Sequence, residues 1–345
     1  MSLKLRWVGA EDRDRVAETR MLCYAPARRE LSEYVQRLRD DPRTGPGDWL
    51  LAEDDGGQAV GTATGIPMTM WVRGSPVPCQ GVAHVGTIKT FRRKSGAGVA
   101  TAVMNETLRM ARERGFVVSA LMPFRGTFYE HFGYGFVERA GDGPIRSCTY
   151  FEQSHQSHLD TVKVVETLYD DMPALRRVLA FLGSLRDQYS FASVVLPADL
   201  RVNWLLREAQ MTHRANRNHP TAEARPFTRM QVRVLDHIKL LGAMKLPATA
   251  DRGAVGKVVV AVRETEGDVS KLAIDFADGR AVAASTDASA DVEMSDRVWA
   301  MVALGDVPAS RAVELGLIAV TNWTRLGVLD LLAAAGPAPF CREYF

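Results

Sequence analysis

The sequence predicts an α+β fold (mixed α/β), in which strands and amphipathic helices share several small domains. Two patterns along the chain favour this class. Hydrophobic runs of strand length alternate with helical patterns in the first half of the chain, and strands precede helices in the last third. With 345 residues, the chain is long enough for two or three domains. Its content of 46% hydrophobic and 24% charged residues is ordinary for a globular protein.

The first expected elements are a strand and two helices. A short strand over residues 3–7 leads into helices over residues 11–24 and 28–40. Residues 41–48 contain two prolines and two glycines, a composition that ends the second helix in a loop.

A β-hairpin should follow this loop. Strands over residues 49–53 and 59–71 flank Asp54-Asp55-Gly56-Gly57, a strong hairpin signal. Pro67 interrupts the second run, so a bulge or a sheet edge is expected there. Residues 73–78 form the next turn.

A glycine-rich turn, Arg93-Lys94-Ser95-Gly96-Ala97-Gly98, is the most informative motif of the chain. It follows a strand-like run over residues 85–90 and precedes a helix over residues 99–114. The first amides of a helix have no partners within it, and glycines let the backbone close around a pyrophosphate. The turn therefore indicates a phosphate site, the alternative being an ordinary basic turn that caps a helix. It matches neither the dinucleotide-binding fingerprint nor the P-loop.

The helix after the turn has one apolar stripe, which includes Val99, Val103 and Ala111, and should pack on a sheet. Gly115 should end it. Residues 116–121 then have the pattern of a buried, parallel strand. The order of strand, turn, helix and strand predicts a right-handed crossover unit.

Charge and cysteine usage argue against several classes of function. The net charge of +2 gives no reason to expect nucleic-acid binding. The four cysteines have no zinc or redox spacing and the seven histidines form no metal-binding pair, so no metal is expected. Free thiols suit a reducing cytosol. The N-terminus has no long apolar run, so we expect no signal peptide, no membrane span and a cytoplasmic location.

The turn at residues 93–98 resembles the R-x-x-G-x-G turn of the GNAT acyltransferases, which bind acetyl-CoA. The resemblance implies that the pantetheine arm lies between two splayed strands and bonds to the backbone of the first, at Ile88, Lys89 and Thr90. It also implies that one set of residues cradles the pyrophosphate: Arg93, Gly96, Ala97, Gly98, Val99, Ala100 and Thr101. Acetyl-CoA is thus expected as co-substrate.

Residues 127–136, with the sequence TFYEHFGYGF, match the Y-x-x-F-G-Y-G segment of the Eis (enhanced intracellular survival) branch of the GNAT enzymes. By that resemblance Tyr129 protonates the departing thiolate of CoA. A phenol of pKa about 10 and a thiol of pKa about 8.5 are close enough for such a transfer. Aromatic packing around a glycine turn is the alternative, which we prefer for Tyr134 but not for Tyr129. Phe124 and Arg125 should line the thioester end.

The chain ends in an aromatic residue, Phe345. In the Eis branch a C-terminal carboxylate on an aromatic residue folds back into the active site as a base, and the resemblance implies this role for Phe345. A free carboxylate, with a pKa of about 3.3–3.7, is a weak base unless desolvation raises its pKa. It could instead orient the incoming ammonium. His84, His131 and Glu130 are alternative bases.

Residues 1–150 form the expected GNAT domain, and residues 151–226 resemble a shortened, degenerate GNAT-like unit of Eis proteins. The second unit has no R-x-x-G-x-G turn and is expected to bind no cofactor. Its expected elements are a linker at 151–160, strands at 161–168 and 189–196, and helices at 172–186 and 198–209.

Residues 227–345 resemble the sterol-carrier-protein-like domain that ends Eis proteins. The segments Ala-Asp-Val-Glu-Met-Ser at 290–295 and Ala-Leu-Gly at 303–305 carry the resemblance. The domain could hold a lipid in an apolar tunnel or act as a scaffold that delivers Phe345, and we favour the scaffold. Its expected elements are strands at 230–235, 255–263, 270–275 and 281–284 and helices at 236–244, 291–304, 308–315 and 322–335.

These features predict an acetyl-CoA-dependent N-acetyltransferase that moves an acetyl group to a primary amine by direct attack. A lipid or small-molecule binding protein with a vestigial acetyltransferase domain is the alternative. The resemblance implies a small-molecule or lysine amine as acceptor, aminoglycosides included, and a homo-oligomer, by resemblance a hexamer. Glu30, Glu33 and Asp40 could make the cleft acidic for a cationic acceptor, or could be a solvated charged face.

Overall fold

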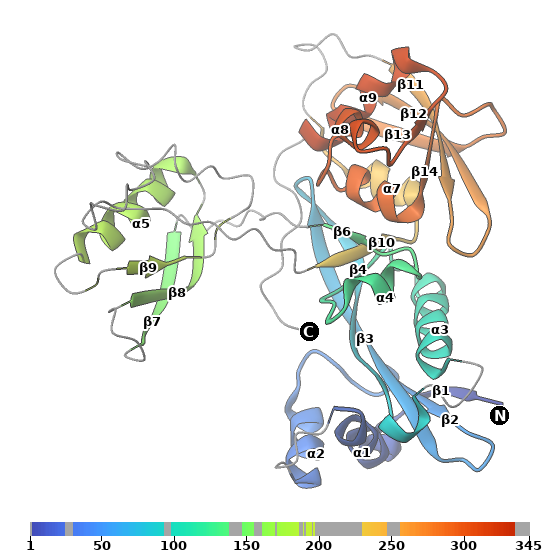
Figure 1. The fold of residues 1–345 in the computed structure, drawn as a ribbon, viewed down its shortest axis with the longest axis vertical. Helices are drawn as coiled ribbons and strands as arrows, with labels where there is room; N and C mark the ends of the chain where they lie inside the picture. The colour runs from blue at the N-terminus through green and yellow to red at the C-terminus, as the bar shows by residue number, and fades with distance from the viewer. Residues whose placement is uncertain are drawn as a thin grey trace, which may run out of the picture. The chain divides into compact units, whose positions relative to one another are not determined.

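The computed structural model divides the chain into two compact units (Figure 1). The first unit combines residues 1–137 with residues 229–345, and the second holds residues 138–228. The residues that the structure describes are 2–24, 30–92, 98–137, 147–154, 161–169, 171–185, 189, 191–194, 196, 230–246 and 256–334.

A seven-stranded sheet lies at the centre of the first unit. Its order is β1 (Lys4–Val8), β2 (Trp49–Glu53), β3 (Ala59–Val72), β4 (Ser75–Thr87), β5 (Val118–Leu121), β10 (Gln231–Val234) and β6 (Gly135–Phe136). Neighbouring strands are antiparallel except for β4 and β5, which are parallel. The predicted parallel strand after the phosphate turn and helix is therefore confirmed.

The hairpin between β2 and β3 forms where the sequence predicts it. Asp54 Oδ1 accepts hydrogen bonds from the amides of Gly56 and Gln58 at 3.0 and 2.9 Å. Pro67, expected at a bulge or an edge, lies beyond Thr64, where the pairing of β3 with β2 ends. β3 has a neighbour on one side only at that point, so the missing amide of Pro67 removes no ladder hydrogen bond.

Helices cover both faces of this sheet (Figure 1). They are α1 (Arg13–Tyr24), which follows a 3-10 turn at Ala10–Asp12, α2 (Leu31–Asp40) and α3 (Val99–Glu113). Gly61 of β3 lies against Val99 and Val103 of α3, whereas Gly86 of β4 lies against Cys23 of α1. Since Gly86 pairs with Thr62, the neighbour of Gly61, α1 and α3 lie on opposite faces.

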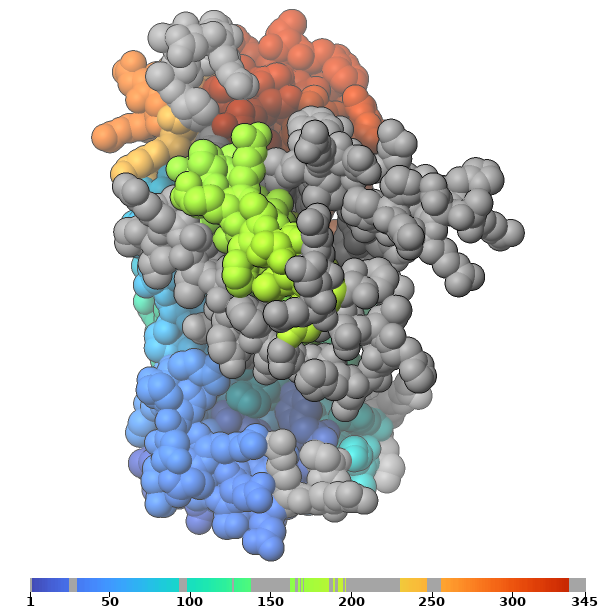
Figure 2. All heavy atoms as spheres, turned by 90° about the vertical axis from the view of Figure 1, so that its left-hand side faces the viewer, coloured from blue at the N-terminus to red at the C-terminus, as the bar shows by residue number. Residues whose placement is uncertain are grey.

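Most of α2 is at least partly exposed, and Leu38 is its buried residue. The blue atoms of the N-terminal part of the chain form one end of the surface in Figure 2. Among the described residues, no helix is long and apolar enough to cross a lipid bilayer.

Strand β10 joins the last third of the chain to the sheet of the first. The sequence places this strand in the domain of residues 227–345, but it lies between β5 and β6 and pairs antiparallel with both. Val118 of β5, Val232 of β10 and Trp299 belong to one continuous hydrophobic core. The strand pattern of β10 was visible in the sequence, but no local pattern names a strand's partner. The division at residues 150 and 226 stays a prediction.

A second sheet forms in the last third of the chain, with the order β13 (Arg280–Ser285), β12 (Val269–Ala277), β11 (Gly256–Arg263), β14 (Val292–Ser295) and β15 (Ala319–Val320). Its helices are α6 (His237–Ala243), α7 (Asp296–Ala303), α8 (Ala309–Glu314) and α9 (Trp323–Ala334). The single helix expected over residues 291–304 is wrong in its first turn. Val292–Ser295 is instead a strand parallel to β11. The helix begins only after it, because Ser295 caps α7 by accepting a hydrogen bond from the Val298 amide at 3.3 Å.

The second unit contains a three-stranded sheet of β7 (Ser147–Ser154), β8 (Thr161–Tyr169) and β9 (Phe191–Ser193), with α5 (Met172–Ser184). The linker expected at 151–160 is wrong over its first residues, which continue β7 and pair with β8. α5 begins as predicted, with Pro173 in its first turn and Asp171 accepting from the Ala174 amide at 2.7 Å. The helix expected at 198–209 lies outside the described residues.

Candidate active site

The parallel strands β4 and β5 pair over a short stretch and then diverge. Cys79, Gln80 and Gly81 of β4 face Val118, Ser119 and Ala120 of β5. β5 ends one residue later, whereas β4 continues to Thr87 with β3 as its neighbour. The pair therefore splays, as the GNAT resemblance implies.

A β-bulge lies in β4 just beyond this point. The pairing of β3 with β4 shifts between Thr62 and Thr64, so that His84 and Val85 stand opposite Ala63. His84 adopts φ +53°, a left-handed conformation that is uncommon outside glycine. A bulge leaves backbone groups out of the ladder. One of them, the Val85 carbonyl, accepts a hydrogen bond from Tyr24 Oη of α1 at 2.5 Å.

Ile88, Lys89 and Thr90 lie after the end of β4, which stops at Thr87. Lys89 and Thr90 belong to a 3-10 turn, Lys89–Phe91, and are exposed. The Ile88 amide donates to the Val60 carbonyl at 2.9 Å, and the Ile88 carbonyl accepts from the Phe91 amide at 2.9 Å. Protein partners therefore occupy the amide and the carbonyl of Ile88. Along β4, the bulge at His84 and Val85 lies nearer than Ile88 to Gly81, where the pairing with β5 ends.

The first turn of α3 presents unpaired amides. Gly98 is the N-cap, and no side chain of the described residues caps the helix. The hydrogen bond from the Ala102 amide to the Gly98 carbonyl, at 3.0 Å, closes the first turn. The amides of Val99, Ala100 and Thr101 precede that bond and have no helical partner. Arg93, Gly96 and Ala97 lie outside the described residues.

A pocket of about 340 Å³ adjoins this helix end. Thr101 and Asn105 of α3 line one side, and Phe128, His131 and Phe132 line another, on or just after α4 (Gly126–Glu130). Arg233, Thr265 and Glu266 of the last third of the chain complete it. The pocket thus combines residues from the first turns of α3 with polar, charged and aromatic residues.

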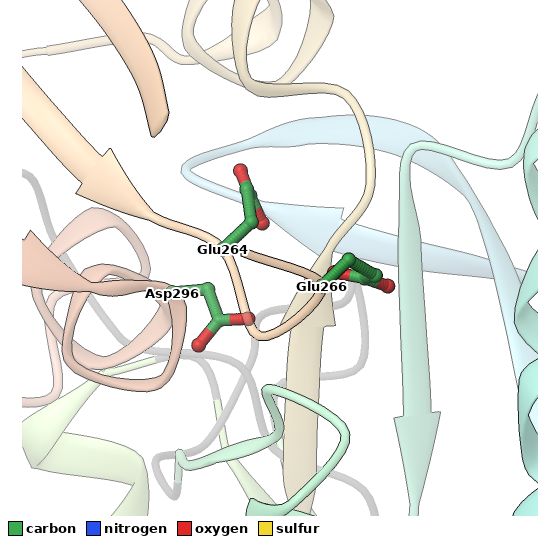
Figure 3. Close-up of side chains that lie close together, drawn as sticks. All are labelled: Glu264, Glu266 and Asp296. Carbon is green, nitrogen blue, oxygen red and sulfur yellow. The ribbon is translucent and has the colours of Figure 1, made fainter. Parts of the chain in front are cut away.

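Three carboxylates meet beside this pocket (Figure 3). Glu264 and Glu266 come from the loop between β11 and β12, and Asp296 begins α7. Arg233 Nη2 lies 2.5 Å from Glu266, 3.6 Å from Glu264 and 3.7 Å from Asp296. Burial would raise the pKa of Glu266, but its hydrogen bond to Arg233 and the guanidinium charge outweigh burial and lower it to about 2. The cluster is therefore an ion-pair centre built around Arg233.

Tyr129 and Tyr134 lie in one aromatic cluster near the splay but have different surroundings. Tyr129 is 5% exposed, and the Phe124 ring packs edge-on against its ring, with 6.4 Å between the two ring centroids. Burial raises the pKa of Tyr129 to about 12. Tyr134 is fully buried, and its hydroxyl lies 2.7 Å from Ser119 Oγ on β5. These contacts suit the packing role preferred for Tyr134.

A second group of polar side chains lies on the α1 face of the bulge. Arg20 Nη2 donates to Thr64 Oγ1 at 2.6 Å, and His84 Nδ1 lies 3.5 Å from the same oxygen. Although His84 as a whole is an exposed residue, desolvation, followed by the charge of Arg20, lowers the pKa of its imidazole to about 3. Tyr24 is partly exposed, but burial of its hydroxyl end, the nearby Cys23 and then Tyr129 raise its pKa. Tyr24 and Tyr129 are thus close enough to interact electrostatically.

Sequence reasoning missed Arg20, Tyr24 and Thr64. The available signal was the helical spacing of Arg20 and Tyr24, one turn apart, with a cation interrupting the apolar stripe of α1. Of the proposed alternative bases, Glu130 forms an ion pair with Arg297 at 2.7 Å. Arg125 is exposed at the N-cap of α4.

Phe345 lies outside the described residues.

The chain is similar over its full length to several solved structures. Eis1 from Mycobacterium abscessus has a TM-score of 0.77 at 16% identity, with 100% of both chains covered. A GCN5-related N-acetyltransferase from Anabaena variabilis ATCC 29413 has a TM-score of 0.76 at 16% identity, again with 100% of both chains covered. A GCN5-related N-acetyltransferase from Kribbella flavida has a TM-score of 0.70 at 20% identity, and the similarity covers 100% of this chain and 98% of the other. Among curated proteins, none matches the chain.

The family comparison covers the part of the chain that contains the splay, the α3 end and Tyr129. Residues 4–137 match the family model of the acetyltransferase (GNAT) domain. The solved structures share the fold of the whole chain, which is mixed α+β. Residues 4–137 are thus a GNAT acetyltransferase domain, and the protein is an acetyltransferase.

Proposed function

We propose that the protein transfers the acetyl group of acetyl-CoA to a primary amine by direct attack. The observation that carries this proposal is the divergence of β4 from β5 beside Tyr129, with the bulge of β4 at the same point. Two strands that part in this way can hold an extended thioester and the amine in one orientation, which supplies much of the acceleration.

The described residues fit a CoA nucleotide. The unpaired amides of Val99, Ala100 and Thr101 form an anion site at a helix N-terminus. A Cβ on Gly98 would lie 3.0 Å from Thr101 Oγ1, so a larger residue would crowd this site. The pocket beside α3 offers Phe128 for stacking and Asn105 for hydrogen bonding. We expect backbone groups of the bulge, rather than those of Ile88, to contact the pantetheine arm and to polarise the thioester carbonyl.

Tyr129 is the proposed general acid. Its phenol is protonated throughout the physiological range because burial raises its pKa to about 12. A thiolate that leaves in the same desolvated surroundings is more basic than in water, which brings donor and acceptor closer. Phe124, in contact with Tyr129, is proposed to line the thioester end with Arg125.

The carboxylate of Phe345 is the proposed base or ammonium-orienting group. Two alternatives are weakened by their surroundings. His84, with a pKa near 3, accepts a proton poorly, and Glu130 is paired with Arg297. His131 lines the pocket beside α3, away from the bulge.

The last third of the chain is proposed to act as a scaffold of the sterol-carrier-like type. Its support is β10, which completes the sheet of the acetyltransferase domain. A lipid-binding role is the alternative function. We also propose, from the family resemblance, a cytoplasmic homo-oligomer, with six subunits as the expected number, acting on an amine of a small molecule or lysine.

The test is release of CoA from acetyl-CoA across a panel of aminoglycosides, polyamines, lysine peptides and arylamines. The intact chain and a chain lacking Phe345 are compared. We expect turnover with one class of amine and its loss on removing Phe345. A folded protein that neither binds acetyl-CoA nor turns over any amine would contradict the proposal and favour the lipid-binding alternative.

A further inference from the structure

Arg20 is a buried cation without a carboxylate partner among the described residues. Arg20 is 6% exposed, and its Nη2 donates a hydrogen bond to Thr64 Oγ1 at 2.6 Å. Its Nε has no hydrogen-bond partner. The nearest acid that influences it, Asp41, forms an ion pair with Arg43 at 2.9 Å. Proteins rarely bury a charge without pairing it, because desolvation is expensive.

The groups around Arg20 are able to donate hydrogen bonds. Thr62 and Thr64 alternate along β3 and so share the face that α1 covers. Thr62 Oγ1 is buried and, like Arg20 Nε, has no partner. The His84 ring lies 3.5 Å from Thr64 Oγ1. A guanidinium, two hydroxyls and an imidazole together match a carboxylate, which accepts several hydrogen bonds at once.

This group lies at the proposed reaction centre, on the face opposite α3. His84 belongs to the bulge of β4, and Tyr24, one turn from Arg20 on α1, bonds to the next residue, Val85. Tyr24 also interacts electrostatically with Tyr129. The nucleotide site on α3 occupies the other face of the sheet, so the α1 face is left for the acceptor.

We propose that Arg20, with Thr62, Thr64 and His84, binds a carboxylate, and that the acceptor is an amine that also carries one, such as an amino acid or a peptide end. This inference rests on the proposed acetyl transfer. The positive charge of Arg20 would repel a polycationic amine. The same chemistry also admits the chain's own C-terminal carboxylate on Phe345, so the experiment separates these two sources.

The experiment compares amines that differ by one carboxylate. Phenylalanine with phenethylamine and lysine with cadaverine are assayed by CoA release, using the intact chain, Arg20→Met and Arg20→Lys. Arg13→Met, on the same helix, is the matched control. We expect the intact chain to prefer the carboxylate-bearing member by about tenfold or more in kcat/KM, as a charged hydrogen bond allows. Arg20→Met should remove this preference through KM, Arg20→Lys should restore part of it, and Arg13→Met should keep it.

The chain lacking Phe345 distinguishes the sources of carboxylate. If the acceptor supplies it, this deletion leaves the preference between the paired amines intact. If Phe345 supplies it, the deletion and Arg20→Met lower turnover of both members equally, and combining them adds nothing. The proposal would be overturned if Arg20→Met had no effect on turnover. It would also be overturned if Arg20→Met and the Phe345 deletion lowered turnover of all amines equally and their effects added when combined.

A binding measurement separates this inference from the proposed function. Calorimetry with CoA present compares N-acetylphenylalanine with its amide and needs no turnover. Tighter binding of the acid, lost in Arg20→Met but not in Arg13→Met, supports the carboxylate site even if every tested amine is inactive. Equal binding of acid and amide by a chain that turns over amines would overturn the site and leave the proposed function standing.

Discussion

Tyr129 and Tyr134 illustrate that burial alone does not decide the role of a phenol. Tyr134 is fully buried, and its hydroxyl is paired with the Ser119 hydroxyl at 2.7 Å, so this phenol has a fixed partner. Tyr129 is nearly as buried, and desolvation is the cause that raises its pKa. A protonated phenol without such a partner is the better candidate for donating to a ligand.

Replacing Tyr129 by Phe should lower kcat by about 10²–10³-fold, the range typical of a lost general acid. The KM for acetyl-CoA and its affinity measured by calorimetry should change little, because the ring remains in place. Steady-state CoA release checks this expectation. Unchanged turnover would remove Tyr129 from the mechanism.

Replacing Tyr134 by Phe is the matched control. It removes the hydrogen bond to Ser119 and should cost about 1 kcal/mol in the free energy of unfolding, as for a typical buried hydrogen bond. Its kcat should stay near that of the intact chain. Urea unfolding and the same CoA-release assay measure both quantities, and a loss of kcat as large as that of Tyr129→Phe would argue against the assignment.

His84 should make the protein less stable in acid. Its pKa falls from 6.5 to about 3 on folding, first because of desolvation and then because of Arg20. Below about pH 6.5 the unfolded chain therefore binds a proton that the folded chain does not, and the free energy of unfolding falls as the pH drops toward 3. The replacement His84→Asn, which tolerates the left-handed backbone, should flatten this dependence between these limits. Urea unfolding at several pH values checks it, and parallel curves for both chains would contradict it.

At the scale of elements, the N-terminus of α3 is the part of the site with the simplest physical basis. No side chain caps this helix, so its first amides stay available. An anion bound there is favoured by those amides and by the helix dipole.

A valine at position 98 should therefore weaken acetyl-CoA binding. The added Cβ would lie 3.0 Å from Thr101 Oγ1, and the branched side chain would crowd the amides. We expect the KM for acetyl-CoA to rise by about tenfold, equivalent to 1.4 kcal/mol, with little change in kcat. Gly242→Ala, where an added Cβ meets nothing within 4 Å, should leave KM unchanged. A similar KM in Gly98→Val and the intact chain would count against a phosphate site at α3.

Most elements could be predicted from local patterns, and the exceptions share a cause. The hairpin at Asp54, the helix ended by Gly115 and the parallel strand after it follow from turn chemistry and periodicity. The strand Val292–Ser295 was misread because its alternation is too short to separate from the helix that Ser295 begins. At the site, motifs pointed to Tyr129 and Gly98, but Arg20 and Thr64 carry no motif.

At the scale of the whole molecule, Arg233 holds together segments from distant parts of the sequence. It lies on β10, is 1% exposed, and its Nη1 donates to the Phe132 carbonyl at 2.8 Å while Nη2 meets the three carboxylates. Phe132 and Glu266 both line the pocket beside α3. The last third of the chain thus supports the proposed nucleotide site through one guanidinium.

Arg233→Met should lower the free energy of unfolding by about 3–5 kcal/mol, because it leaves the buried Asp296 and the half-buried Glu264 without this buried cation. It should also raise the KM for acetyl-CoA, since the pocket wall loses its anchor. Urea unfolding and CoA-release kinetics measure these effects. Arg112→Met removes the exposed partner of Glu266 and should cost under about 1 kcal/mol. A cost of Arg233→Met no larger than that of Arg112→Met would contradict the proposed anchoring role.

The class of fold, the order of most elements and the family resemblance of the first domain could all be predicted from the amino-acid sequence. These properties are local: periodicity, glycine and proline positions, and short motifs are written in consecutive residues. Tertiary structure alone decided that β10 completes the sheet between β5 and β6, that Arg233 joins three carboxylates, and that Arg20 lies beside Thr64 and His84. The physical reason is that pairing partners and buried charges depend on which distant segments pack together, and a strand or a helix face does not specify its neighbour.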